Sequence, residues 1–232
     1  MRAILLAAGK GTRMYRHFKC PKSALKVDGK PIIRHSVEIL CEKGIDVTIV
    51  LGYDCETVRE CLVGIDVDYC YNPFYSVTNS LGSLWFAREY LVPGEQVIIA
   101  NADVYWEPLL LDRLLEAPGK MVMVGDSSRY EVGDYFFYVE DGMLAKFGKE
   151  LDISERNYEY VGLAKIAGDR VGAFSERLES MVKEEKYGLW WENVLYNYLS
   201  EEPVSVVDVP DLFWAEVDYV QDYERIKEYI RT

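Results

Sequence analysis

The chain has 232 residues, and half of them are hydrophobic, which is enough to bury a substantial core in one domain. Its 39 acidic side chains outnumber 26 basic ones, and the formal net charge of −13 argues against general binding to nucleic acid or to an anionic membrane. No apolar run approaches the roughly 20 residues that span a bilayer. The five cysteines form no CxxC pair and the opening residues do not read as an export signal, so we expect reduced thiols and a cytoplasmic location.

Strand-like and helical patterns alternate through the first half of the chain. In order, we expect a strand at residues 2–7, a helix at 32–43, a strand at 47–51, a helix at 56–62, a strand at 67–71, a helix at 81–90, a strand at 96–101, a helix at 109–115 and a strand at 121–125. Strands rich in Val and Ile that are separated by helices predict a mainly parallel, Rossmann-like sheet with helices on both faces.

The pattern changes after residue 125. Short aromatic or β-branched runs at 135–138, 144–147 and 160–166, separated by Asp-Gly and polar turns, predict antiparallel strands. Helices around 173–184 and 191–199, a strand at 204–209 and a helix at 222–230 complete the expected elements. We therefore expect one α/β domain over residues 1–232, with an antiparallel elaboration in its second half.

A basic, glycine-bearing segment follows the first expected strand. Seven basic side chains and one acid, Asp28, lie between residues 10 and 30. Ligands of parallel α/β sheets bind beyond the carboxyl ends of the strands. Glycines allow backbone N–H groups to approach phosphate oxygens, while Arg13 supplies a bidentate fork and Lys22 a point charge. The segment matches neither GxxxxGK[ST] nor GxGxxG, so the residues alone leave a phosphate-binding loop and a solvated surface loop both open.

Acidic side chains follow two later apolar runs. Asp103 comes after the strand expected at 96–101, and Glu216 and Asp218 follow a short apolar run near the end of the chain. Mg²⁺ prefers oxygen ligands, commonly one or two carboxylates with phosphates and waters, and nucleotidyl transfer needs such charge neutralisation. Each acid also has an ordinary interpretation, Asp103 as a turn residue and Asp218 as the N-cap of the last helix.

The segment "LLAAGKGTRM…PKSALKVDGKPII" resembles the signature of the nucleotidyltransferases that make nucleoside-diphosphate derivatives of sugars and alcohols. "NAD" at 101–103 and "EVD" with "QDY" at 216–223 are similar to Asp-Ala-Asp and Glu-Ile-Asp with Gln-Asp-Tyr in the bacterial CTP:phosphocholine cytidylyltransferases. The resemblance implies the nucleotide-diphospho-sugar transferase type of fold, with a nucleotide-binding half at about 1–125 and an acceptor-binding half at about 126–232.

The resemblance also implies roles for individual residues. The position of Arg13 binds the leaving pyrophosphate, that of Lys22 neutralises the reacting phosphates, and Asp103 and Asp218 hold Mg²⁺, for which Mn²⁺ can substitute. Asn101 replaces an acid of the family. The other nucleotide-binding residues that we expect are Leu6, Ala7, Ala8, Gly9, Gly11, Thr12, Asn79, Ser80, Gly82, Ser83 and Ala102.

The segment at 72–87 bears on the nucleotide and has two interpretations. Its polar side chains and free N–H groups at a helix start can read a base edge or bind phosphate, or they form an ordinary helix N-terminus capped by Thr78 or Asn79. The related cytidylyltransferases place an Asn-rich segment here in the nucleotide pocket. The expectation of CTP as the nucleotide rests on that likeness.

Aromatic residues gather in the second half of the chain. Aromatic faces attract quaternary ammonium groups, which suits phosphocholine, whereas a primary ammonium, as in 2-aminoethylphosphonate, favours hydrogen bonds to carboxylates. Core packing is the ordinary interpretation of the same rings. The candidate acceptor-binding residues are Tyr135, Glu159, Trp190, Trp191, Glu192 and Glu216.

The favoured hypothesis is a Mg²⁺-dependent cytidylyltransferase that transfers CMP from CTP to a small phosphorylated amine and releases pyrophosphate. Phosphocholine is the preferred acceptor, with 2-aminoethylphosphonate and phosphoethanolamine as possibilities. A sugar-1-phosphate nucleotidyltransferase is the alternative on the same scaffold, and an inactive nucleotide-sensing module is the alternative of another class. Monomer and homodimer both stay open.

Overall fold

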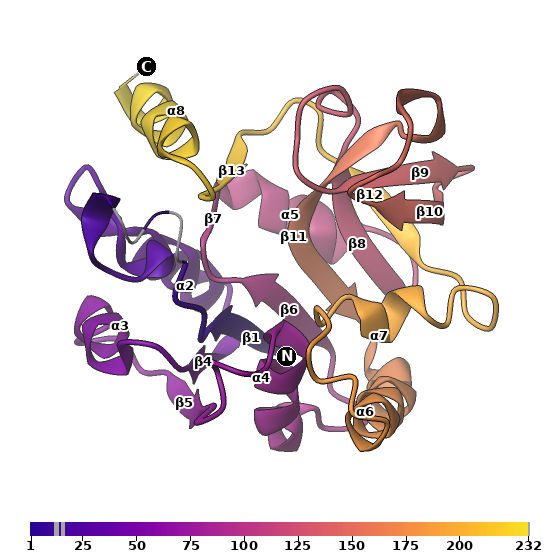
Figure 1. The fold of residues 1–232 in the computed structure, drawn as a ribbon, viewed down its shortest axis with the longest axis horizontal. Coiled ribbons are helices and arrows are strands. Elements are labelled where there is room, and N and C mark those ends of the chain that lie inside the picture. Colours follow the sequence, from indigo (N-terminus) through magenta and orange to yellow (C-terminus); the bar gives the residue numbers. More distant parts are fainter. Residues whose placement is uncertain (12–13, 15–16, 232) are drawn as a thin grey trace.

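The computed structural model describes residues 1–11, 14 and 17–231. Nine strands of this described part form one sheet in the order β5-β4-β1-β6-β11-β8-β12-β10-β9 (Figure 1). The first section is parallel throughout and consists of β1 (Arg2–Ala7), β4 (Asp46–Leu51), β5 (Asp68–Tyr71) and β6 (Val97–Asn101). The Rossmann-like half expected from the alternating pattern is confirmed.

The second section of the sheet is mixed. It contains β8 (Met121–Asp126), β9 (Phe136–Glu140), β10 (Met143–Gly148), β11 (Tyr158–Ile166) and β12 (Ser205–Asp208). β11 runs antiparallel to both β6 and β8, β12 runs parallel to β8, and β9 and β10 form an antiparallel hairpin. The expected antiparallel elaboration is therefore present, and its strands continue the same sheet.

Helices cover both faces of the sheet because its strands are apolar on both sides. In β1, Ala3, Leu5 and Ala7 belong to one buried cluster and Ile4 belongs to another. The first cluster includes residues of α2 (Ile32–Glu42), α3 (Cys55–Cys61) and α5 (Pro108–Glu116). The second includes residues of α4 (Ser80–Phe86), α6 (Gly168–Lys183) and α7 (Asn193–Tyr196). Figure 1 shows α2 and α3 near β1 and β4, and α6 and α7, drawn in orange, at the opposite side of the view.

Short elements stand outside the main sheet. β2 (Lys26–Val27) pairs with β3 (Lys30–Pro31), and β7 (Val104–Trp106) pairs antiparallel with β13 (Trp214–Glu216). α8 (Val220–Arg231) packs on the second pair and buries Ile226 there. Among the described residues, every helix is too short or too polar to span a bilayer.

Two expected helices are shorter in the structure, and one strand pair was not expected. The helix expected at 81–90 ends at Phe86, and its last turn tightens into a 3₁₀ helix at Arg88–Tyr90, a common form at helix ends. The helix expected at 191–199 covers only Asn193–Tyr196, and turns lead from it to Pro203, which cannot continue a helix. The pair β7–β13 was not expected, because three-residue strands are too short to show an alternating pattern.

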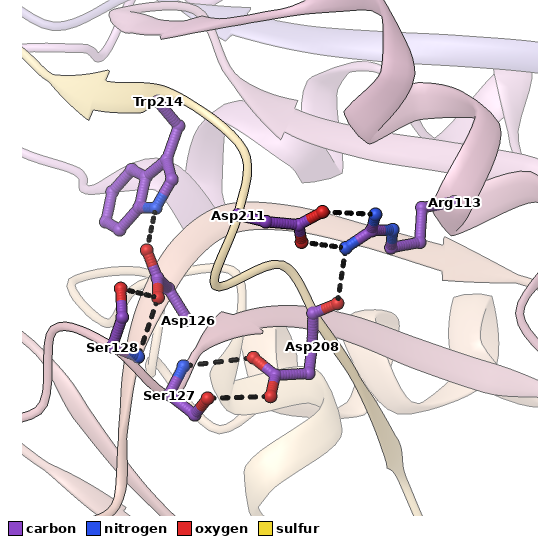
Figure 2. A network of polar contacts seen from close by, with 7 residues as sticks. All are labelled: Arg113, Asp126, Ser127, Ser128, Asp208, Asp211 and Trp214. Atoms are coloured by element: carbon purple, nitrogen blue, oxygen red, sulfur yellow. Dashed lines mark hydrogen bonds and ion pairs between the residues drawn. The ribbon is translucent and has the colours of Figure 1, made fainter.

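Two aspartates fix the ends of β8 and β12 through side-chain hydrogen bonds (Figure 2). The buried Asp126 accepts from the backbone N–H and hydroxyl of Ser128 on one oxygen, and from the Trp214 indole N–H at 2.8 Å on the other. Asp208 accepts from the backbone N–H and hydroxyl of Ser127. Since Trp214 is the first residue of β13, its bond to Asp126 attaches β13 to the sheet.

The replacement Trp214→Phe should lower the free energy of unfolding by about 1–3 kcal/mol, because it leaves one oxygen of a buried carboxylate without a donor. Urea titration of the two proteins measures the change. Trp85→Phe is the matched control, since the Trp85 indole donates to Glu179 in a less buried place. An equal loss in both variants, or no loss in Trp214→Phe, would contradict the anchoring role of this bond.

Candidate active site

A pocket of about 330 Å³ opens at the edge of the sheet where β1 and β6 end. The two strands are parallel, with Leu6 opposite Asn101 in register, so their carboxyl ends meet at this edge. The residues that follow each strand line the pocket, as the topology of open α/β sheets predicts. Its volume lies in the range of small-molecule binding sites.

The pocket collects most of the nucleotide-binding residues expected from the sequence. Leu6, Ala7, Ala8, Gly9, Gly11, Asn79, Ser80, Ser83 and Ala102 line it. Gly82 does not; it lies in α4, where a Cβ would come within 2.7 Å of the Thr78 Cβ. Thr12 and Arg13 lie outside the described residues, so their roles stay predictions.

Gly11 makes room for Lys22. Its φ of +57° lies in the left-handed region, and a Cβ at this position would stand 2.6 Å from the Lys22 Cγ. Glycine adopts this left-handed conformation without strain and has no Cβ to collide with Lys22. The side chain of Lys22 therefore passes directly over the loop that follows β1 before it reaches the acids.

Lys22 connects the two predicted metal ligands. Its Nζ lies 3.2 Å from the Asp103 Oδ2 and is also bonded to the Asp218 Oδ1. Burial alone would lower the pKa of Lys22, but the charges of Asp103 and Asp218 outweigh it and raise that pKa above its ordinary value. The ammonium group is therefore held charged between the carboxylates.

The pairing of β7 with β13 brings these acids together across 115 positions of sequence. Asp103 immediately precedes β7, Glu216 ends β13 opposite Val104, and the Val217 N–H donates to the Asp103 carbonyl at 3.0 Å. Asp218 follows one residue later. The carboxylate oxygens of Asp103, Glu216 and Asp218 lie within 4.8 Å of one another.

The donor set of this cluster fits a divalent cation. Burial and the carboxylates of Asp103 and Asp218 raise the pKa of Glu216 well above its ordinary value. Among the residues that the structure describes, Lys22 is ion-paired with Asp103 and Asp218, and Glu216 lies beside them. Hard carboxylate oxygens in this number are the ligands that Mg²⁺ and Mn²⁺ take in proteins. Glu216, which the sequence analysis gave as a candidate acceptor-binding residue, lies beside the two aspartates in the same pocket.

The start of α4 is capped from within the protein. Asn79 is the N-cap, and its side chain accepts from the Ser80 N–H at 2.8 Å. The N–H groups of Asn79 and Leu81 donate to the carbonyls of Tyr187 and Leu189. These N–H groups are thus already bonded within the protein, and Thr78, Asn79, Ser80 and Ser83 line the pocket.

The other end of the pocket is aromatic and acidic. Tyr135, Trp190 and Glu192, three of the candidate acceptor-binding residues, line it. Trp191 lies behind the wall: it is fully buried, and its indole N–H donates to the Asn101 side-chain oxygen at 3.0 Å. Glu159 also lies outside the lining and forms an ion pair with Arg129 at 2.6 Å.

Several lining residues were not among the predicted site residues. They are Ser23, Tyr75, Thr78, Asn101, Asp134, Lys149, Tyr160 and Tyr196. Tyr160 and Tyr196 follow ordinary strand and helix spacing, which does not separate a ring in a pocket wall from a ring in the core. Lys149 stands in a turn after β10, where a single exposed lysine has no distinguishing pattern.

Comparison with known proteins agrees with this geometry. The model of the MobA-like NTP transferase domain matches residues 3–179. The chain is 30% identical to the CMP-5'-(3-aminopropyl)phosphonate synthase of Streptomyces rubellomurinus over 94% of its own length, but spans only 37% of that relative. It is 26% identical to the choline-phosphate cytidylyltransferase of Streptococcus pneumoniae, and the match covers 100% of this chain and 99% of the relative.

A solved structure shares the fold from end to end. The CTP:phosphocholine cytidylyltransferase from Streptococcus pneumoniae superposes with a TM-score of 0.81 at 24% identity, covering 99% of this chain and 98% of that one. The matched family model is that of an NTP transferase, and the glycine-bearing loop after β1 and the acids at the sheet edge line one pocket, as such an enzyme requires. The chain belongs to the MobA-like NTP transferase family and is a nucleotidyltransferase.

Proposed function

We propose that the protein transfers CMP from CTP to a small phosphorylated or phosphonate amine, releases pyrophosphate, and requires Mg²⁺ or Mn²⁺. The observation that carries the proposal is the composition of one pocket. The loop after β1, the cluster of Asp103, Glu216 and Asp218 with Lys22, and an aromatic end with the buried Glu192 all line it. These groups suit a nucleotide, a reaction centre and a cationic acceptor.

In the proposed reaction, a phosphate or phosphonate oxygen of the acceptor attacks the α-phosphorus of CTP in line. The bond from this phosphorus to the oxygen that bridges to the β-phosphorus breaks, and pyrophosphate leaves with the electron pair. Both reactants are anions, and a divalent cation held by Asp103 and Asp218 supplies the charge neutralisation that their approach needs. Lys22 contributes a further positive charge at the same place.

The two halves of the chain divide these tasks in the proposal. Residues of about 1–125 supply the loop, Lys22 and Asp103 for the nucleotide, while residues of about 126–232 supply the acceptor end together with Glu216 and Asp218. The choice of CTP is supported by the names of the relatives, which are a cytidylyltransferase and a CMP-phosphonate synthase. Phosphocholine and aminoalkylphosphonates are both members of the proposed acceptor class.

A panel of nucleotides and acceptors tests the proposed function. Pyrophosphate release is measured for CTP, UTP, ATP and GTP with phosphocholine, phosphoethanolamine, 2-aminoethylphosphonate and hexose-1-phosphates. We expect release with CTP and the amines, dependent on a divalent cation. Release with hexose-1-phosphates alone would indicate a sugar nucleotidyltransferase, and release with none of the pairs would indicate a sensing module.

The replacements Asp103→Asn and Asp218→Asn should each lower kcat by at least about 10²-fold while the protein stays folded, because each keeps the size of the side chain but removes a charge that holds the cation. Steady-state kinetics and circular dichroism measure the two effects. Asp112→Asn is the control, since Asp112 pairs with Lys43 at 2.5 Å on the surface. Turnover close to wild type in either cluster variant would reject the metal assignment.

Lys22→Ala should lower kcat by about 10²–10³-fold, which is the typical cost of one lost electrostatic contact to a developing charge. Lys22→Arg should restore only part of the rate, because the guanidinium fork differs in shape from a compact ammonium and its stem must pass Gly11. The surface variant Lys43→Ala provides the control. Full activity in Lys22→Arg would show that any cation suffices at this position.

A further inference from the structure

We infer that the acceptor carries a primary ammonium group, and that its N–H groups are bound by the carboxylate of Glu192 and the hydroxyl of Tyr160. The inference rests on the proposed transfer from CTP and specifies the acceptor of the same pocket. It differs from the expectation of phosphocholine as the acceptor, which was based on the aromatic residues of the second half of the chain. Three observations at the aromatic end of the pocket support it.

The aromatic rings at this end pack mainly against one another. The Tyr196 ring stacks on Phe147, with 4.1 Å between centroids, and on Tyr135, with 5.9 Å between centroids. Trp190 meets Tyr135 edge-on at 85°, and the Lys149 Nζ lies 5.1 Å from the centroid of the Trp190 ring. A cage for trimethylammonium needs several ring faces turned to the ligand. Here the Tyr196 ring stacks on other rings, and the Lys149 ammonium lies over the Trp190 ring, so neither ring face is open to a trimethylammonium group.

Glu192 is a buried carboxylate at the same end of the pocket, with 6% of its surface exposed. Burial raises the pKa of Glu192 to about 7, and the nearby acids Asp103 and Glu216 repel its negative charge. Within the described part of the chain, no lysine or arginine forms an ion pair with Glu192; Lys22 and Arg129 pair with other acids. A buried carboxylate is costly unless a cation pairs with it, and a cationic acceptor meets that need.

The Tyr160 hydroxyl lines the same pocket and faces Glu192. It is buried, and its hydrogen bond with the Glu192 carboxylate contributes to the pKa of that group. A hydroxyl that donates to a carboxylate keeps its own lone pairs, so this oxygen can still accept from a ligand. Asn101 is a second hydrogen-bond partner of the Glu192 carboxylate: its oxygen accepts from the Trp191 indole, and its NH₂ group is left for Glu192.

A primary ammonium group matches these acceptors. Its three N–H groups can donate to the Glu192 carboxylate and to the Tyr160 oxygen in charge-assisted hydrogen bonds. A trimethylammonium group has the same charge but no N–H, and it would place methyl groups against both oxygens. The arrangement therefore selects for hydrogen-bond donors on the acceptor nitrogen as well as for its charge.

The acceptor series with increasing methylation tests the inference on the wild-type protein. With saturating CTP and Mg²⁺, kcat/KM is measured for 2-aminoethyl phosphate, its N-methyl and N,N-dimethyl derivatives, and phosphocholine. We expect a decrease along the series, at least about tenfold from the primary to the trimethylated acceptor, because a site built around N–H donors rejects analogues that lack them.

The outcomes of this series separate the inference from the proposed function. Phosphocholine used as well as or better than 2-aminoethyl phosphate would overturn the primary-ammonium inference and leave the transfer from CTP standing. Absence of turnover with every member of the series would overturn the proposed transfer, and the inference with it.

The variant Tyr160→Phe tests the hydroxyl alone. It should raise KM for 2-aminoethyl phosphate by about tenfold, change KM for CTP by less than about twofold, and reduce the preference over phosphocholine, because one charge-assisted bond is lost. Tyr198→Phe is the matched control, since the Tyr198 ring packs against Arg177 outside the pocket. An unchanged preference in the folded Tyr160→Phe protein would contradict the role of the hydroxyl.

Discussion

β7 and β13 pair over three residues each, and through this pairing two distant parts of the chain form one reaction centre. The backbone bond from Val217 to Asp103 fixes the acids of the two segments at neighbouring positions. β13 is itself attached to the end of β8 by the bond from Trp214 to Asp126, and α8 covers it. The site therefore depends on the packing of the whole second half of the chain, although the loop after β1 belongs to the first.

The concentration of negative charge at this place explains the unusual basic segment of an acidic protein. Three carboxylates lie close together, and Lys22 reaches two of them by crossing Gly11. In the proposed reaction a triphosphate would add more negative charge, and a divalent cation with positive groups of the basic segment would balance it locally. At the other end of the pocket, the buried Glu192 would pair with the cationic group of the proposed acceptor.

The features that depend on neighbouring residues in the chain could be predicted from the sequence. The βαβ alternation, the loop after β1, and Asp103 after an apolar strand were all predicted from neighbouring residues. The β7–β13 pairing was not, because its strands are short and their partners lie about 110 positions apart. The position of Glu216 beside Asp103 follows from that pairing, and its assignment to the acceptor stays a prediction. Likewise, the spacing of Tyr160 and Tyr196 fits a core as well as a pocket wall, and only the tertiary structure separates the two.

Diffraction from crystals grown with Mn²⁺ and a non-hydrolysable CTP analogue measures the central claim directly, because the anomalous signal of manganese locates the ion. The account predicts an ion bonded to oxygens of both Asp103 and Asp218 at about 2 Å, and to the α-phosphate of the nucleotide. An ion held by phosphates alone, with both aspartates still bonded to Lys22, would contradict it.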